Sequence, residues 1–293
     1  MSQERIDRGK KLHINLSHDA VMIMQHDMDS FQVKQKSVFI NRILCNVKYN
    51  PEWDAEDLMK ESYGKEEQFK IHLNKENAID YSGIYVKAVL EKYCRENFVK
   101  RETIYAKDLF EQISAAITGE KWIKLVFVSG RTVKIMPYTI KTDLLSMYHY
   151  VIGYEKVPDA DGKMVKKSFS CRISSLDRAV CCKKHAFISQ KDKKALDSEM
   201  RCKGTQFMCD DVMRHEIYFT DHGIQLYNRM LHLRPAAVDI SEDGHTYTFE
   251  CSQRQIEYYI FKFGADAEVL SPESTRKIFQ QKYRDAVSGY DAE

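Results

Sequence analysis

The stretch of this 293-residue chain that most constrains its fold is HYVIGY, at residues 149–154. It lies inside an apolar and aromatic segment, residues 147–157, which is typical of a β-strand. Residues 158–162 contain proline, aspartate and glycine, which are typical of a turn. Residues 164–173 are then predicted to form the partner strand of a hairpin. The middle of the chain is therefore predicted to be antiparallel β-structure.

Further strands are expected on both sides of this hairpin. Residues 122–128 and 132–136 form one pair, which turns at Ser129-Gly130 and ends at Pro137-Tyr138. Residues 179–182 add a short strand. So many short antiparallel strands within residues 119–195 are typical of a small curved sheet or barrel.

Three segments of this region resemble the WYL-domain family, whose fold is a small Sm-like β-barrel. They are the HYVIGY run, the basic-x-x-Pro-Tyr element at residues 134–138, and the strand that ends in Arg172-Ile173. Two positions depart from the family pattern. His149 stands where the family has its first aromatic residue, and Cys171 stands where an acidic residue usually precedes the arginine.

The resemblance implies a pocket that binds nucleic acid or a nucleotide-like ligand around the tyrosine and arginine positions. Basic side chains suit phosphate, and tyrosine rings stack with unpaired bases, typically for about 1–3 kcal/mol per base. The candidate residues are Arg131, Lys134, Tyr138, Tyr150 and Arg172. The alternative for the tyrosines is a place in the core, which is what we expect for Tyr148 and Tyr154.

Residues 1–50 predict one strand followed by two helices. Apolar side chains occupy every second position over residues 10–16, so one face of the strand is buried. The outward face carries Lys11, His13 and Asn15. Ser17 and Ser37 are good N-caps for the two helices, the second of which stops before Pro51.

A unit of this size cannot bury three apolar faces alone, because too much of its surface stays exposed. No second copy is evident downstream, so we expect the strand to pair with that of a second chain. The arrangement resembles the ribbon-helix-helix family, whose dimers bind nucleic acid with an antiparallel ribbon. The resemblance implies contacts from Lys11, His13 and Asn15, with a phosphate at the amides of Ser37 and Val38. The alternative is a ribbon that serves only dimerisation.

Residues 51–118 are predicted to be connecting helices. Apolar side chains recur at helical spacing over residues 84–89 and 109–117. Lys100 and Arg101 lie between these stripes and suit either a solvated helix face or contact with a polyanion.

Residues 196–293 predict the order β-α-β-β-α-β, the split motif of ferredoxin-like folds, and then a last helix. Ser252 opens the second helix with a capping box, and Ser271-Pro272-Glu273 opens the last one. With Phe263-Gly264, these residues resemble the extension that follows WYL domains. The resemblance implies a dimerisation element.

Charge is unevenly distributed, although the total is only +2. Residues 119–195 contain 16 Lys and Arg against 7 Asp and Glu, a net of +9, and residues 1–50 have a net of +3. The segments 51–118 and 196–293 are acidic, at −4 and −6. The basic segments are therefore the expected polyanion-binding surfaces.

Composition and motifs narrow the class of protein. The polar amino terminus and the lack of an apolar run of about 18–20 residues predict a cytoplasmic protein without a membrane span. Eight cysteines without a C-x-x-C pair predict free thiols rather than a zinc site. No G-x-S-x-G elbow, P-loop or H-E-x-x-H helix is present, so we expect no catalytic residues, no metal and no cofactor.

The order of the three segments resembles the WYL-domain accessory proteins of type VI-D CRISPR systems. The resemblance implies a non-catalytic α+β multidomain homodimer, which binds single-stranded RNA and stimulates the RNA-guided RNase effector. The alternative is a ligand-responsive, DNA-binding transcription regulator, with the ribbon on an operator and a ligand in the WYL pocket.

Overall fold

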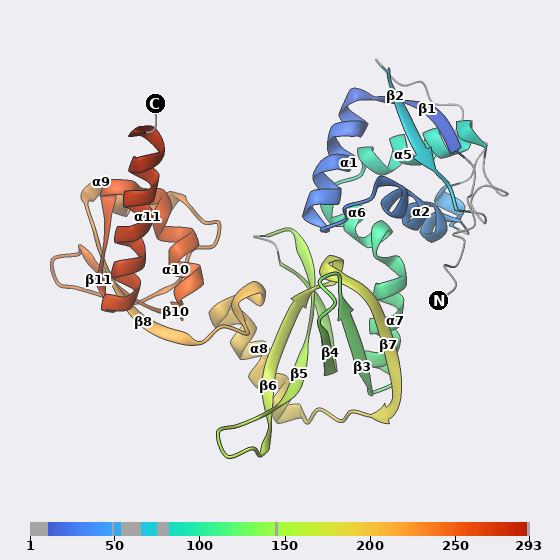
Figure 1. The fold of residues 1–293 in the computed structure, drawn as a ribbon. Coiled ribbons are helices and arrows are strands. Elements are labelled where there is room, and N and C mark those ends of the chain that lie inside the picture. The colour runs from blue at the N-terminus through green and yellow to red at the C-terminus, as the bar shows by residue number, and fades with distance from the viewer. Residues whose placement is uncertain (1–10, 49, 54–65, 75–81, 144–145, 292–293) are drawn as a thin grey trace, which may run out of the picture. The chain divides into compact units, whose positions relative to one another are not determined.

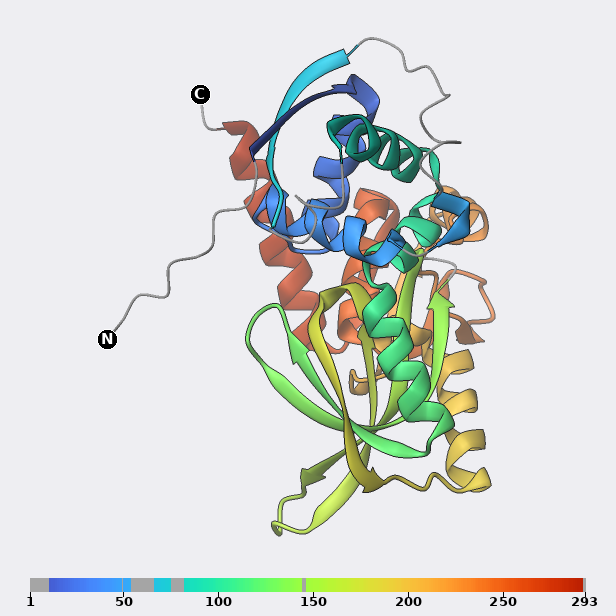
Figure 2. The same ribbon diagram turned by 90° about the vertical axis from the view of Figure 1, so that its right-hand side faces the viewer.

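The computed structural model describes residues 11–48, 50–53, 66–74, 82–143 and 146–291, which form nine α-helices and three sheets (Figures 1 and 2). None of these helices is both long and apolar enough to cross a bilayer. The chain divides into two compact units. The first contains the amino-terminal region to residue 142 together with residues 147–151 and 171–187; the second contains residues 143–146, 152–170 and the chain from residue 188 onward.

The first unit begins with β1 (Lys11–Ser17), α1 (His18–Ser30) and α2 (Lys36–Val47). This is the expected order, and Leu12, Ile14 and Leu16 are buried as the alternation predicts. Ser17 caps α1, because its Oγ accepts the Ala20 N–H.

The strand that pairs with β1 belongs to the same chain. β2 (Glu66–His72) runs antiparallel to β1, from Lys11 opposite His72 to Ser17 opposite Glu66. Two helices follow β2, namely α5 (Gly83–Arg95) and α6 (Phe98–Tyr105). Helix α5 packs on β1 and α1, whereas α6 packs on α2 (Figure 1). The expectation that a second chain must complete the ribbon is therefore wrong. Residues 51–118 are not all helical either, because they supply a second strand-helix-helix run that covers the apolar faces of the first.

A buried ion pair joins these two runs. Arg101 of α6 donates from Nε and Nη2 to the carboxylate of Asp27 of α1, at 2.6 and 2.9 Å. The hydroxyl of Tyr93 donates to the same carboxylate at 2.7 Å. Beside them, the ring of Tyr105 stacks on Phe31, with centroids 4.9 Å apart. Arg101 is therefore a core residue, with 10% of its side chain exposed, and is not part of a solvated helix face.

The middle sheet has the strand order β6-β5-β4-β3-β7. Its strands are β3 (Lys121–Phe127), β4 (Thr132–Asp143), β5 (Tyr148–Pro158), β6 (Met164–Arg172) and β7 (Leu176–His185). All five were expected, but β4 does not end at Pro137-Tyr138. Its pairing with β3 stops at Ile135, so β3 does not need the N–H that Pro137 lacks. The helix before the sheet, α7 (Lys107–Thr118), packs against β3 and β7 (Figures 1 and 2).

This sheet is open over the described residues, and the expected closed barrel does not form, because β6 and β7 are not paired with each other. The segment after α8 (Gln190–Lys203) occupies the outer edge of β6 instead. Ser170 donates its N–H to Cys209 Sγ at 3.0 Å and its hydroxyl to the Thr205 carbonyl at 2.7 Å. A side chain therefore satisfies the N–H that a closing strand would bind.

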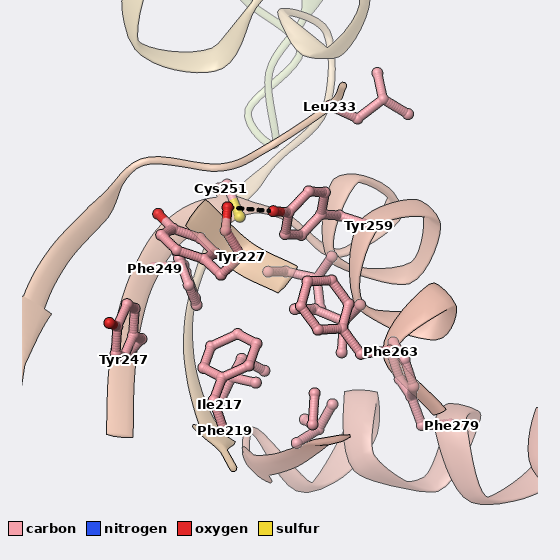
Figure 3. Close-up of a cluster of buried hydrophobic side chains, with 14 of the residues drawn as sticks. Ile217, Phe219, Tyr227, Leu233, Tyr247, Phe249, Cys251, Tyr259, Phe263 and Phe279 are labelled. Carbon is pink, nitrogen blue, oxygen red and sulfur yellow. Dashed lines mark hydrogen bonds between the residues drawn. The ribbon is translucent and has the colours of Figure 1, made fainter. Parts of the chain in front are cut away.

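The second unit contains a separate antiparallel sheet with the order β11-β8-β10-β9. Its elements are β8 (Val212–Phe219), α9 (Asp221–Arg229), β9 (Ala237–Ile240), β10 (Thr246–Ser252), α10 (Gln253–Ile260) and β11 (Ala267–Ser271), and α11 (Glu273–Asp291) follows. This is the order that the sequence predicts. Figure 3 shows its aromatic core, in which the ring of Phe263 lies between those of Phe219 and Tyr259, with centroids 5.4 and 5.2 Å away. The hydroxyl of Tyr259 donates to the Tyr227 carbonyl at 3.3 Å.

Candidate nucleic-acid interface

The ribbon formed by β1 and β2 presents an exposed polar face. Lys11, His13 and Asn15 are exposed on β1, as predicted. They lie opposite His72, Lys70 and Gln68 of β2, which are exposed as well. The β2 half of this face was not predicted, although the apolar residues at positions 69, 71 and 73 have the period-two spacing of a strand.

Ser37 lies inside the first turn of α2, whose N-cap is Gln35. Its hydroxyl accepts the His72 N–H at 3.3 Å, and the nearby Asn41 side chain donates to the His72 carbonyl at 2.9 Å. These bonds fasten the end of β2 to α2. Ser37 is thus not an N-cap, and its observed role is to hold the ribbon in place.

Arg131 and Lys134 are exposed, and each lies over an aromatic ring. Arg131 Cζ is 5.4 Å from the ring centre of Phe127, and Lys134 Nζ is 5.7 Å from that of Trp122. Such contacts hold the aliphatic stem against the sheet while the charge stays in water. Both cations are therefore accessible to an anion, and their binding of phosphate stays a prediction.

Tyr150 is a core residue and is only 4% exposed. Val151 and Ile152 beside it are fully buried, so both faces of β5 are covered at this point. Tyr138 is half-buried on β4. Tyr150 therefore offers no ring face to a base.

Arg172 contacts Tyr148 instead. Its guanidinium Cζ lies 4.4 Å from the centre of the Tyr148 ring, and the arginine side chain is exposed at the end of β6. Tyr148, which was expected in the core, is only half-buried and meets Phe98 edge-on, with centroids 5.0 Å apart. The ring orients the guanidinium on one side and leaves it accessible.

His149, which departs from the family pattern, has a buried partner. Its backbone N–H and its ring Nδ1 both lie 2.7 Å from Glu102 Oε2, and Phe110 meets the ring edge-on. Glu102 is fully buried, and its other carboxylate oxygen has no partner in the described part of the chain. An imidazole can donate a hydrogen bond to this carboxylate and a phenyl ring cannot, which accounts for histidine at this position.

The eight cysteines are free thiols. Burial raises the pKa of the Cys251 thiol to about 12, so it stays protonated and packs as a small apolar group. Among the described residues, no group of three or more His, Cys, Asp or Glu side chains is arranged to hold a metal ion.

Comparison with solved structures reveals a relative in fold. The chain is similar to a crystal structure described as that of a CRISPR Cas-related protein, with a TM-score of 0.73 and 17% identity over 99% of this chain and 97% of the other. The two proteins share a fold. Proteasome accessory factor B/C of Arthrobacter aurescens is less similar, with a TM-score of 0.33 and 12% identity over 100% of this chain and 51% of that one. No protein-family model and no curated protein matches the chain.

Proposed function

We propose that this protein is a non-catalytic, homodimeric accessory protein of a type VI-D CRISPR system, which binds single-stranded RNA and stimulates the RNA-guided RNase effector. The observation that carries the proposal is the fold shared with a CRISPR Cas-related protein over 99% of the chain. Because a fold by itself does not determine function, the exposed side chains supply the rest of the argument.

Arg172 supports binding to single strands rather than duplexes. Proteins bind unpaired RNA by stacking its bases on aromatic rings and on the planes of arginine side chains. The guanidinium of Arg172 is exposed and already oriented by Tyr148, so little of its freedom is lost on binding. Bases in a duplex are stacked on each other and cannot use this plane.

The ribbon favours a second candidate function, that of a DNA-binding regulator that responds to a ligand. A two-stranded ribbon fits the major groove of B-DNA, where lysine, asparagine and glutamine side chains can contact base edges. Lys11, Asn15, Gln68 and Lys70 are exposed on one face of such a ribbon. The same side chains can also bind the phosphates of RNA, so the choice needs an experiment.

A competition measurement separates the two functions. The full-length protein is bound to a fluorescent RNA of about 20 nucleotides at about 150 mM salt, and unlabelled single-stranded RNA or duplex DNA is added as competitor. We expect single-stranded RNA to compete better, with little dependence on its sequence. Tighter binding of a specific duplex would refute the RNA-binding proposal and support the regulator.

A variant tests the proposed contact. Arg172→Gln should weaken RNA binding about 5- to 150-fold, the equivalent of about 1–3 kcal/mol of lost stacking. Arg284→Gln is the matched control, because it removes the same charge from an exposed arginine on α11. The same pair of variants, added to the RNA-guided RNase, should differ in how far they stimulate cleavage. Cleavage of RNA by the purified protein itself, with Mg²⁺ and dependent on its own carboxylates, would refute the non-catalytic part of the proposal.

A further inference from the structure

One face of the middle sheet is basic and exposed on three neighbouring strands. Lys124 on β3 lies directly opposite Lys134 on β4 and opposite Val180 on β7. In the next row, Val126 on β3 lies between Thr132 on β4 and Arg178 on β7. We call this surface the lysine face and define it by its exposed members, which are Lys124, Thr132, Lys134, Arg178 and Val180.

The other side of the same strands is core. Ile123, Leu125 and Ile135 alternate with the lysines along β3 and β4 and are fully buried. The cations of the lysine face therefore all extend to the solvent side of the sheet. Of these cations, only Lys134 was predicted as a site residue.

Two lysines directly opposite each other on adjacent strands repel, because their Cβ atoms are only about 4.5–5.5 Å apart. Within the described part of the chain, no carboxylate forms an ion pair with Lys124 or Lys134. The carboxylate beside Arg178 is that of its own neighbour Asp177, at 3.3 Å, where both side chains are mostly exposed and water screens the pair. The lysine face therefore has uncompensated positive charge.

The spacing of these charges makes them act together. Neighbouring strands lie about 4.8 Å apart, and alternate residues along a strand about 6.6 Å. Lys124 is thus within about one Debye length of both Lys134 and Arg178 at physiological salt, about 8 Å. None of the five defining residues of the lysine face is aromatic, and Trp122, which lies under Lys134, is 7% exposed, so these five residues suit phosphates rather than bases.

We propose that the lysine face binds the sugar-phosphate backbone of single-stranded RNA. This inference rests on the proposed RNA-binding function and adds a surface to it, one that does not depend on base stacking at Arg172. The two contacts are complementary in chemistry. One holds the strand through charge alone, and the other stacks on a base.

The test is the salt dependence of binding to an oligouridylate of about 20 nucleotides. Each phosphate contact to a single strand contributes about 0.7 to the slope of log affinity against log salt. Lys124→Gln with Lys134→Gln should therefore reduce the slope by about 1.4, which weakens binding about 60-fold at ~50 mM salt and about 10-fold at ~200 mM, since the contribution vanishes near 1 M. Arg178→Gln, outside the lysine pair, should reduce the slope by about 0.7.

The matched control is Lys191→Gln with Lys194→Gln, which removes the same charge from exposed positions on α8. We expect this control to keep the wild-type slope, and all variants to melt like the wild type, since no buried group is changed. If wild-type protein binds the RNA but the lysine-face variants have the slope of the control, the lysine face is refuted and the proposed function stands. If wild-type protein does not bind single-stranded RNA, the proposed function itself fails.

Discussion

Replacement of Arg101 by methionine should destabilise the first unit by about 3–5 kcal/mol. The side chain of Asp27 is 0% exposed, and two of its short hydrogen bonds come from Arg101. Methionine retains the apolar volume of the stem but leaves the carboxylate with the Tyr93 hydroxyl as its one short hydrogen bond among the described residues. A buried charge that has lost its partner costs about 3–5 kcal/mol, because the protein interior cannot replace its solvation.

The assay is calorimetry combined with hydrogen exchange, because a chain of two units need not melt in one step. The expected loss lowers the melting temperature of the first unit by about 6–20 °C, at about 2–4 °C per kcal/mol for a unit of this size. Protection should fall in α1, α5 and α6, which the ion pair joins. Lys100→Met is the control at the adjacent position, since the exposed ion pair of Lys100 with Glu96 contributes less than about 1 kcal/mol to the free energy of unfolding.

Replacement of the whole network provides a second check. Asp27→Leu, Tyr93→Phe and Arg101→Met together leave no charge at this site and should recover much of the stability that Arg101→Met alone loses. A melting temperature for Arg101→Met equal to that of Lys100→Met would refute the reasoning, because Asp27 would then not depend on its partner.

Three further outcomes are expected. Gly223→Ala should destabilise the second unit by about 1–3 kcal/mol in denaturant unfolding, because the added Cβ overlaps the carbonyl oxygen of Asp266; an unchanged midpoint would show that α9 can shift. Burial lowers the pKa of His215, so below about pH 6.5 the unfolded chain binds a proton that the folded chain does not, and stability falls as the pH decreases from there. His215→Leu should reduce this slope between about pH 7 and pH 5, and an equal slope in both proteins would contradict the assignment. Tyr150→Ala should cost about 3–5 kcal/mol, whereas Tyr150→Phe should keep the wild-type RNA affinity; a loss of affinity in the phenylalanine variant would return Tyr150 to the binding site.

The strands of the middle sheet and the order of the carboxy-terminal elements could be predicted because their signals are local. Turn residues and alternating side chains lie within a few positions of each other, and β5, β6 and β10 follow them closely. The strand β2 was missed because its apolar positions span few residues in a strongly charged segment. Its pairing partner, β1, lies about fifty residues earlier, and no local pattern specifies that contact.

The arrangement around Arg172 shows the same limit within the candidate site. Alternation places Tyr148 and Tyr150 on one face of β5 and cannot say which of them meets the arginine. The fold brings Arg172, at the end of β6, over Tyr148, while Tyr150 is covered by core residues. The lysine face was missed for a related reason, since Lys124, Lys134 and Arg178 are neighbours only after three strands have been paired.

The sequence by itself determined most of the helices and strands, the caps at Ser17 and Ser252, the turns, and the division into basic and acidic segments. These properties depend on residues within one or two turns of each other, where backbone geometry and side-chain periodicity act directly. Only the tertiary structure decided that β1 pairs within its own chain, that the middle sheet stays open, and that Arg101 is a core residue bound to Asp27, 74 positions away. The hydrophobic effect favours any segment that covers an exposed apolar face. The hydrophobic pattern therefore shows that a face must be covered, but it does not identify the segment that covers it.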